Sequence, residues 1–176
     1  MVIIMKILIL SDIHGDYDSF NKVIKSETFD KLIILGDLFS YSYDFEYYED
    51  EPIIKLLQKF KKKLILIKGN CDTQIDYQKL GLKAFDIITI TLNNNLVTLT
   101  HGNRYCKGFL PEYHGNIFIN GHTHIPMLIK ENNIIYCNPG SIGKPRAKSS
   151  KGYLIFEDNK LILKNINNEI IKELII

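Results

Sequence analysis

Five short polar segments carry most of the residues in this sequence that could bind a metal ion. Each follows an apolar run, and together they contain four of the five histidines. Their carboxylate, imidazole and amide groups favour a transition metal such as Mn²⁺, Fe, Co²⁺ or Zn²⁺ over Ca²⁺ or Mg²⁺. In chain order the segments are Asp12-Ile13-His14, Gly36-Asp37, Gly69-Asn70-Cys71-Asp72, Thr100-His101-Gly102 and Gly121-His122-Thr123-His124.

The spacing within these segments suits metal binding. In Asp12-Ile13-His14, an i, i+2 spacing in an extended loop lets a carboxylate and an imidazole point at one ion. His122 and His124 have the same spacing and can reach two ions that lie close together. Any one such motif is more often a turn former or cap, in about four cases of five. The five together therefore carry the interpretation.

The sequence pattern of the first half of the chain predicts the strands and helices that must position these segments. Apolar runs at Lys6–Leu10, Lys31–Leu35 and Leu64–Ile67 are typical of buried parallel strands. Helical periodicity at Tyr17–Lys25 and Pro52–Phe60 lies between them. The pattern predicts βαβαβ, and open α/β sheets build their sites at the carboxyl ends of the strands. The ligand-bearing segments should therefore meet at one edge.

The second half is predicted to be mainly β structure. Turns are expected at Asn93-Asn94-Asn95, Asn132-Asn133 and Asp158-Asn159, because Asn and Asp tolerate left-handed backbone angles. The predicted strands are Phe85–Leu92, Leu96–Thr100, Ile117–Asn120, Leu128–Glu131, Ile134–Cys137, Tyr153–Phe156 and Leu161–Asn165.

Length and composition predict a single soluble domain over residues 1–176. The chain is 45% hydrophobic and 24% charged, and its formal net charge is +2. The basic residues are scattered, so we expect no stable complex with nucleic acid. Met1–Leu10 is expected to be a buried first strand rather than a signal peptide, and no apolar run is long enough to span a membrane.

The three cysteines predict a reducing environment. Cys71, Cys106 and Cys137 are odd in number and lack CxxC spacing, which argues against a disulfide framework and favours the cytoplasm.

Two polar stretches, Phe39–Glu51 and Gly143–Lys151, are either substrate-facing loops or ordinary solvated ones.

From Lys6 to about Ser141, the order of these motifs resembles the calcineurin-like metallophosphoesterases. Gly69-Asn70-Cys71-Asp72, Asn138-Pro139-Gly140-Ser141 and the short length look most like the YfcE-type phosphodiesterases of that superfamily. The resemblance implies an α/β fold of the four-layer αββα sandwich type. It implies two divalent ions, with manganese preferred and zinc, iron, cobalt or nickel as alternatives. It also implies a homo-oligomer.

The same resemblance implies a specific ligand set. One ion would be held by Asp12, His14, Asp37 and His124, and the other by Asp37, Asn70, His101 and His122, with Asp37 bridging. Two such ions can lower the pKa of a bridging water, so that a metal-bound hydroxide attacks phosphorus.

Charge favours a phosphodiester as the substrate. Two divalent cations less the carboxylates of Asp12 and Asp37 leave about +2, which a hydroxide and a singly charged diester would neutralise. The protein-phosphatase branch adds an arginine that Gly36-Asp37-Leu38-Phe39-Ser40-Tyr41 lacks. The alternatives are a phosphomonoesterase of the same fold and a non-catalytic scaffold.

Two further residues are assigned to catalysis. Asn70 could direct an amide N–H at a phosphate oxygen while its carbonyl faces a metal. Cys71 stands where the protein-phosphatase branch has histidine, and is the candidate proton donor to the leaving group, with a packing role as the alternative. Asn103 replaces a histidine that many relatives have, and could bind substrate, orient a ligand or simply be a loop residue. Cys106 and Cys137 are assigned to packing.

Overall fold

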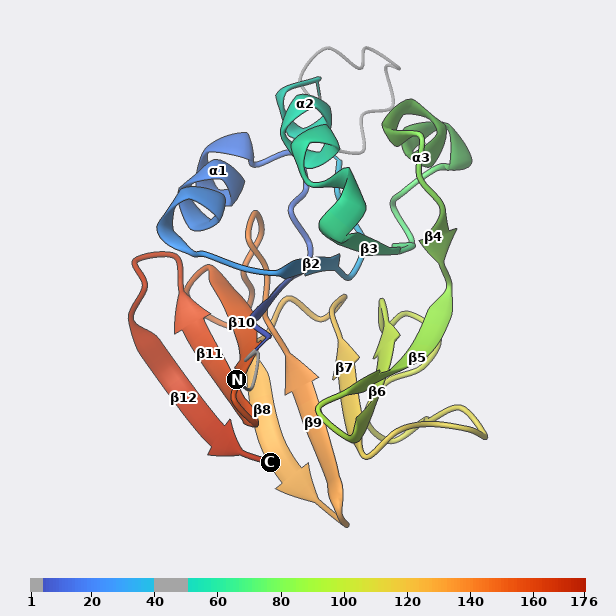
Figure 1. The fold of residues 1–176 in the computed structure, drawn as a ribbon, viewed down its shortest axis with the longest axis vertical. Coiled ribbons are helices and arrows are strands. Elements are labelled where there is room, and N and C mark those ends of the chain that lie inside the picture. Colours follow the sequence, from blue (N-terminus) through green and yellow to red (C-terminus); the bar gives the residue numbers. More distant parts are fainter. Residues whose placement is uncertain (1–4, 40–50) are drawn as a thin grey trace.

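The computed structural model describes residues 5–39 and 51–176 of the chain. Two sheets pack face to face, and three helices cover the outer face of the larger one (Figure 1). The larger sheet has the order β12 (Ile170–Ile175), β11 (Lys160–Asn165), β10 (Gly152–Glu157), β1 (Ile7–Leu10), β2 (Lys31–Ile34), β3 (Leu64–Ile67) and β4 (Ala84–Phe85). The smaller has the order β5 (Ile87–Leu92), β6 (Asn95–Thr100), β7 (Ile117–Asn120), β9 (Ile134–Asn138) and β8 (Met127–Glu131).

Two of the helices begin at polar side chains that satisfy free backbone N–H groups. In α1 (Tyr17–Ser26), the Asp16 carboxylate accepts from the N–H of Ser19. In α3 (Gln74–Leu80), Thr73 and Asp76 form a capping box. The remaining helices are α2 (Glu51–Lys59) and a 3₁₀ turn, η2 (Lys61–Lys63). None of the helices described is long and apolar enough to cross a bilayer.

Two apolar cores explain why the first strands are apolar at every position. On β1, Leu8 and Leu10 pack under the helices, whereas Ile7 and Ile9 pack against the second sheet. All four are at most 1% exposed. A strand covered on both faces has no solvent side, and so its sequence shows no alternation.

Most of the predicted elements are confirmed. β1, β2 and β3 are parallel neighbours, with α1 and α2 between them in the chain. The three predicted turns are present, and Asn93 and Asn94 illustrate them with φ values of 45° and 65°. Left-handed angles at both central residues match the right-handed twist of hairpin strands. The corresponding pairs Asn132, Asn133 and Asp158, Asn159 also have positive φ.

Some expectations require correction. Phe85–Leu92 is not one strand, because β4 ends at Phe85 and pairs with β3, whereas β5 begins at Ile87 and pairs with β6 in the other sheet. The first strand begins only at Ile7, and Met5 is exposed. The elements α3 and β12 were not predicted. Residues 1–4, and 40–50 of the predicted tyrosine-rich loop, lie outside the described residues.

The two-sheet sandwich agrees with the predicted fold class, with one difference in its fourth layer. All helices described lie over the larger sheet (Figure 1). On the outer face of the smaller sheet, Phe118 and Tyr136 are buried without a helix above them. The loop after β6 reaches this face, since Gly115 N–H donates to Thr98 Oγ1 and the Lys107 ammonium lies 5.9 Å from the Tyr136 ring.

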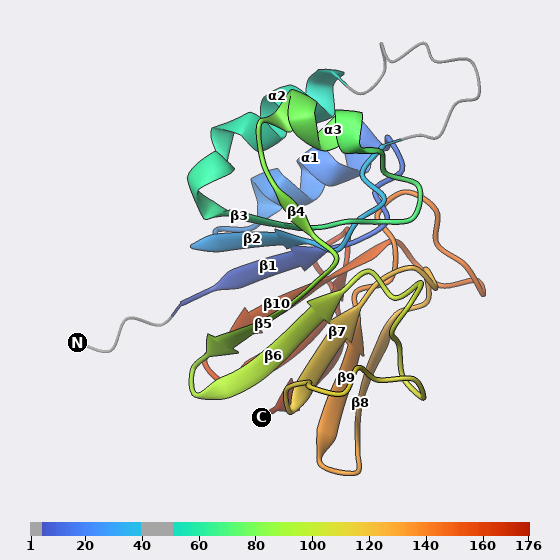
Figure 2. The ribbon, with the colours of Figure 1, turned by 90° about the vertical axis from the view of Figure 1, so that its right-hand side faces the viewer.

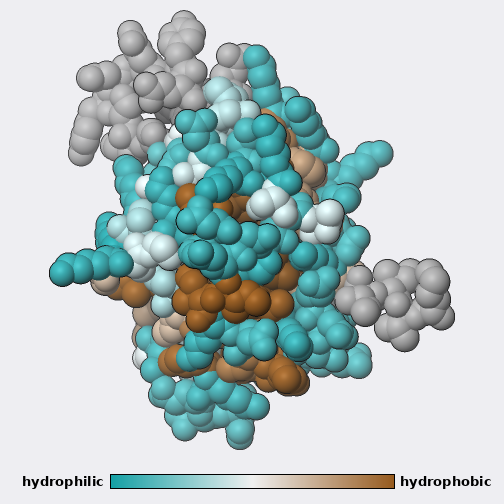
Figure 3. All heavy atoms as spheres, turned by 90° about the vertical axis from the view of Figure 1, so that its left-hand side faces the viewer, coloured by the Kyte–Doolittle hydropathy of each residue, from teal (hydrophilic) through white to brown (hydrophobic). Residues whose placement is uncertain are grey.

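Edge strand β12 exposes apolar side chains. Ile170, Ile171 and Ile175 are 58%, 45% and 70% exposed. Figure 3 shows apolar groups gathered on this face of the molecule. Such patches often mark protein contacts, and the expected homo-oligomer stays a prediction.

A buried carboxylate joins two of the loops that follow the parallel strands. Asp72, 6% exposed, accepts hydrogen bonds from the backbone N–H groups of Asp37 at 2.8 Å, Leu38 at 2.9 Å and Gly69 at 2.9 Å. The Tyr77 hydroxyl donates to the same carboxylate at 2.5 Å. Asp72 therefore sets the distance between the loops after β2 and β3.

Replacing Asp72 should cost more than replacing an exposed aspartate. Asp72→Ala leaves three buried N–H groups without their acceptor, and we expect a loss of at least about 3 kcal/mol in the free energy of unfolding. Tyr77→Phe removes the hydrogen bond donated to Asp72 and a longer one, at 3.3 Å, accepted from the Gly69 N–H, and should cost about 1–2 kcal/mol. The exposed Asp18 provides the matched control, since Asp18→Ala should cost less than about 1 kcal/mol. Urea unfolding measures all three, and equal losses for Asp72→Ala and Asp18→Ala would contradict this role.

Candidate metal centre

The ligand-bearing loops open on one edge of the molecule. Figure 2 shows the ends of β1, β2 and β3 on the same side as the ends of β6 and β7. Asp12 and His14 follow β1, Asp37 follows β2, and Asn70 follows β3. His101 follows β6, and His122 and His124 follow β7. All seven predicted ligands therefore come from strand ends that face one another.

Four of the seven form a compact cluster. Asp12, His14, Asp37 and His124 offer ligand atoms that all lie within 4.8 Å of one another. His124 Nε2 lies 3.0 Å from Asp12 Oδ1 and 3.3 Å from His14 Nε2. Ligands placed about 2.0–2.2 Å from one ion lie at most about 4.4 Å apart. The cluster is thus close to the size that a single divalent ion requires.

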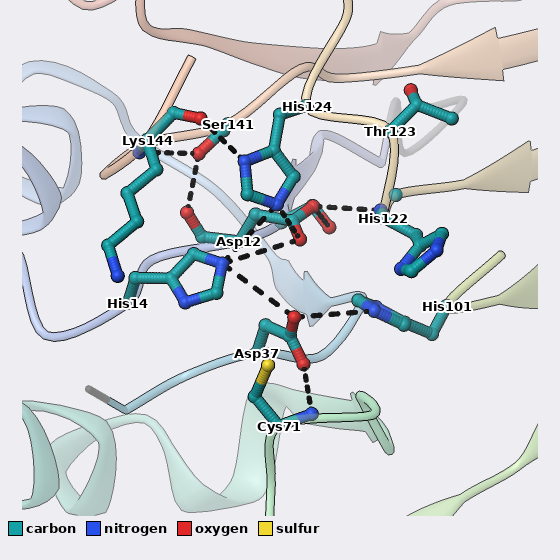
Figure 4. Close-up of polar contacts among 12 residues, drawn as sticks. Asp12, His14, Asp37, Cys71, His101, His122, Thr123, His124, Ser141 and Lys144 are labelled. Atoms are coloured by element: carbon teal, nitrogen blue, oxygen red, sulfur yellow. Dashed lines mark hydrogen bonds and ion pairs between the residues drawn. The ribbon is translucent and has the colours of Figure 1, made fainter. Parts of the chain in front are cut away.

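His101 and His122 lie on the side of the site away from His14 (Figure 4), and Asn70 contacts His101. His101 Nε2 lies 3.5 Å from Asp37 Oδ2 and 3.0 Å from Asn70 Oδ1. The rings of His101 and His122 are 5.1 Å apart, centroid to centroid. Asp37 Oδ2 also lies 3.6 Å from His14 Nε2. One carboxylate oxygen therefore faces both groups of ligands.

One buried oxygen shows that the cluster fits a cation. Asp12 Oδ2 accepts from Ser11 Oγ at 2.5 Å and from the His122 N–H at 3.0 Å. Asp12 Oδ1 is buried and has no hydrogen-bond partner among the described residues. A buried acceptor left without a donor is costly. Because Oδ1 is directed at the imidazoles of the cluster, a bound cation would satisfy it.

The backbone at the site is strained in a consistent way. Asp12, His14, Asp37, His122 and His124 all have positive φ, between 48° and 68°. Non-glycine residues seldom adopt this left-handed conformation, although Asn, Asp and His do so more readily than others. Such strain concentrates at functional sites, and here it affects five of the seven predicted ligands.

Two glycines allow the loops to approach this closely. A Cβ atom on Gly69 would lie 2.1 Å from Asp37 Oδ1, and one on Gly121 would lie 1.8 Å from Ser11 Oγ. Any side chain at either position would displace the carboxylates of the centre or their partners. The glycines of these motifs are thus required by close approach.

Backbone carbonyl groups fix the orientation of two imidazoles. His101 Nδ1 lies 2.6 Å from the Leu35 carbonyl oxygen, and His124 Nδ1 lies 2.5 Å from that of Lys144. A carbonyl oxygen can only accept, so each Nδ1 carries a proton, and in the neutral ring Nε2 presents its lone pair to the centre. Metal-binding histidines are commonly held in this way.

Residues around the ligands were not assigned roles from the sequence. Ser141 Oγ donates to the Asp12 carbonyl at 2.7 Å and accepts from the Lys144 N–H at 2.8 Å. The Arg146 N–H donates to the His124 carbonyl. Part of the predicted loop Gly143–Lys151 therefore packs on the centre, and Figure 4 shows the Lys144 side chain beside His14. The Asn-Pro-Gly-Ser motif signalled this region but not its contacts.

Burial and neighbouring groups shift the ionisation of the site. Burial lowers the pKa of His14, which favours the neutral imidazole that a metal binds. Burial alone would raise the pKa of Asp37, but its contacts with His101 and the Cys71 N–H hold that pKa far below its usual range. The carboxylate is therefore charged throughout the neutral range.

Cys71 lies beside the shared carboxylate. Its N–H donates to Asp37 Oδ1 at 2.9 Å, and its sulfur accepts from Asn70 Nδ2 at 3.2 Å. Burial, together with the Asp37 charge, raises the pKa of the Cys71 thiol to about 11. Cys137 is fully buried and packs between the sheets. Cys106 is half-buried, and its backbone forms an isolated antiparallel β-bridge with that of Phe109. All three are free cysteines.

Comparison with known proteins places this arrangement in a family. The model of the calcineurin-like phosphoesterase superfamily domain matches residues 5–160. Phosphodiesterase YfcE of Escherichia coli K12 is 28% identical over 94% of each chain. The E. coli YfcE structure, described as a phosphoesterase, superposes with a TM-score of 0.86 at 25% identity, covering 97% of this chain and 98% of that one. Vacuolar protein sorting 29 from Cryptosporidium parvum shares the fold, with a TM-score of 0.66 at 15% identity over 97% and 98% of the two chains. The chain thus belongs to the calcineurin-like phosphoesterase superfamily.

Proposed function

We propose that this protein is a phosphodiesterase that uses two divalent metal ions. Asp12, His14, Asp37 and His124 would hold one ion, and Asp37, Asn70, His101 and His122 the other. The single observation that carries the proposal is the position of Asp37 Oδ2, which lies 3.6 Å from His14 Nε2 and 3.5 Å from His101 Nε2. It stands where both ligand groups meet.

Two bound ions would activate a water molecule and stabilise the charge that develops on phosphorus. The residues of the chain would position the reactants. Hydrogen bonds to Leu35 and Lys144 already aim His101 and His124 inward. Asn70 carries an amide donor beside Cys71 that could turn to a phosphate oxygen. Little reorganisation is needed when donors are arranged beforehand.

Charge supports a diester as the substrate. The carboxylates of Asp12 and Asp37 reduce the charge of two divalent ions to about +2, which suits a hydroxide and a monoanion. The name of the similar YfcE protein, a phosphodiesterase, agrees with this assignment. Lys144 supplies one further cation beside His14. This makes a phosphomonoesterase the second candidate.

The ligand types and the cysteines support our proposals for the metal and for the cellular compartment. The proposed ligand atoms are imidazole nitrogens, carboxylate oxygens and one amide oxygen, without thiolate. This set suits manganese, our preferred ion, as well as iron, cobalt, nickel or zinc. Free thiols at all three cysteines fit a reducing cytoplasm, which we propose as the location.

Two chromogenic esters separate the candidate activities. With manganese, we expect hydrolysis of bis-p-nitrophenyl phosphate with a kcat/KM at least about tenfold above that for p-nitrophenyl phosphate, because the diester matches the site charge. Asp37→Asn should reduce either activity by at least about a hundredfold, since it weakens the binding of both ions. Asp18→Asn, on the exposed face of α1, is the matched control. A higher kcat/KM for the monoester would contradict the phosphodiesterase and favour a phosphomonoesterase. No turnover of either ester would favour a non-catalytic scaffold.

Cys71 is proposed as the proton donor to the leaving group. The raised pKa keeps its thiol protonated at neutral pH. We expect Cys71→Ala to slow hydrolysis of a diester with an alkyl leaving group about a hundredfold, and of a p-nitrophenyl ester hardly at all, because nitrophenolate leaves without protonation. Cys137→Ala, at the buried cysteine between the sheets, reports any general loss of folding. Equal effects of Cys71→Ala on both leaving groups would exclude this role.

A further inference from the structure

A cavity of about 480 Å³ opens beside Asn70, on the flank of the proposed metal centre. Its volume lies within the range of about 300–1,000 Å³ that is usual for small-molecule sites. Gly69 and Thr100, which adjoin proposed ligands, also line it. A substrate held at the two ions could therefore extend one ester arm into it. The groups that give the cavity its chemistry are Lys68, Asp86, Asn103, Arg104 and Tyr105.

The aromatic ring in this cavity is supported from within its own loop. Tyr105 stacks on Phe109 with ring centroids 5.9 Å apart and an interplanar angle of 15°. The Arg104 guanidinium carbon lies 5.2 Å from the centre of the Tyr105 ring. Two backbone hydrogen bonds between Cys106 and Phe109 close the loop that carries these side chains. The result is a layered arrangement of planar groups, on which a flat ligand could stack.

Polar groups of both signs line the same cavity as this ring. The side chains of Lys68 and Asp86 are exposed, and no hydrogen bond or ion pair engages either one among the described residues. Asn103 is also exposed and adds an amide. The cavity therefore combines cationic donors, one carboxylate acceptor and an amide with an aromatic surface.

The cavity continues away from the metal centre. A second one of about 360 Å³ shares Lys68 and Asp86 with the first, and is also lined by Lys83 and Gln78. The second cavity follows α3 and β4, and the two together leave room for a ligand larger than a simple alkyl group. Cationic side chains interleaved with an aromatic ring are the usual surroundings of a nucleobase and its phosphate backbone.

We propose that this cavity binds the nucleoside of a nucleotide-bearing phosphodiester, with the base stacked at Tyr105 and Arg104. The inference rests on the proposed phosphodiesterase function and names its substrate class. Water would supply the oxygen of the new P–O bond, and the P–O bond to one alcohol would break. One water proton passes to that alcohol and the other stays with the phosphate or enters solvent. The products are a nucleoside monophosphate and an alcohol.

A nucleoside fits better than simpler groups would. A purely anionic arm would meet the Asp86 carboxylate, and a purely apolar arm would leave Lys68 and Arg104 desolvated without partners. A base has π faces for stacking, and its edges carry both donors and acceptors. The net charge of +2 and scattered basic residues argue against a long nucleic acid as the ligand.

Competitive inhibition of the manganese-loaded enzyme tests this subsite, with bis-p-nitrophenyl phosphate as the reporter. Methyl phosphate, ribose 5-phosphate and adenosine 5′-monophosphate share a phosphate but differ in what the cavity can bind. We expect adenosine 5′-monophosphate to bind about tenfold more tightly than ribose 5-phosphate, the size of effect that one base–aromatic stack gives. Tyr105→Ala and Tyr105→Leu should remove this advantage and leave the inhibition constant of methyl phosphate unchanged. Tyr113→Ala, at a tyrosine 82% exposed and outside the cavity, should preserve it.

The outcomes separate this inference from the proposed function. Turnover of the reporter, with equal inhibition by adenosine 5′-monophosphate and ribose 5-phosphate, would overturn the nucleoside subsite alone. An advantage that survives both Tyr105 substitutions would do the same. Absence of turnover would overturn the proposed phosphodiesterase. Calorimetric titration of the three phosphates still measures the preference in that case, and equal affinities would reject the subsite as well.

Discussion

The arrangement of this site depends on one carboxylate, that of Asp37. Its Oδ2 faces His14 on one side and His101 on the other, while its Oδ1 accepts from the Cys71 N–H. Asp12 is a second buried carboxylate. Its Oδ1 lies 3.8 Å from His14 Nε2 and accepts no hydrogen bond from the described residues. These two buried negative charges raise the pKa values of His101 and His124, so the carboxylates attract positive charge to the site. Divalent ions bound between the carboxylates and the imidazoles would supply that positive charge, which is the main physical reason to place metal ions here.

The rest of the fold serves to hold that carboxylate in place. Parallel strands β1, β2 and β3 bring their loops to one edge, and Asp72 binds the loop that carries Asp37 to the loop that carries Asn70. Gly69 and Gly121 permit the contact distances, and five of the proposed ligand residues have left-handed backbone angles. Helices cover one face of the larger sheet and the second sheet covers the other, so the strands beneath the site are buried on both sides.

The sequence predicted the parts of this arrangement that local chemistry determines. Apolar runs ending in Asp, Gly or Asn identified β1 to β3, and Asn pairs identified the hairpin turns. It did not predict α3, a helix of seven residues whose capping box, Thr73 and Asp76, was the available signal. Phe85–Leu92 was taken as one strand, because nothing in its apolar pattern indicates that Asp86 lies between two sheets. The exposed side chains of β12 gave no clear alternation to detect.

The same limit applies to the site. Residue types and order were enough to name seven candidate ligands, since each stands at a strand end. The supporting contacts of Ser141, Asp72 and the Lys144 carbonyl depend on how distant segments meet, which spacing along the chain does not encode. The cavity at Tyr105 was invisible for the same reason, because its lining comes from loops more than thirty residues apart in the chain, such as those of Lys68 and Arg104.

The metal content of the chain tests the shared role of Asp37 most directly. After dialysis against manganese, elemental analysis should find about two ions per chain in the wild type, and about one in either His14→Ala or His101→Ala, because each variant damages only one ligand group. Asp37→Asn should retain clearly less than one. A wild-type content of one ion that His101→Ala leaves unchanged would contradict a site built around a shared carboxylate.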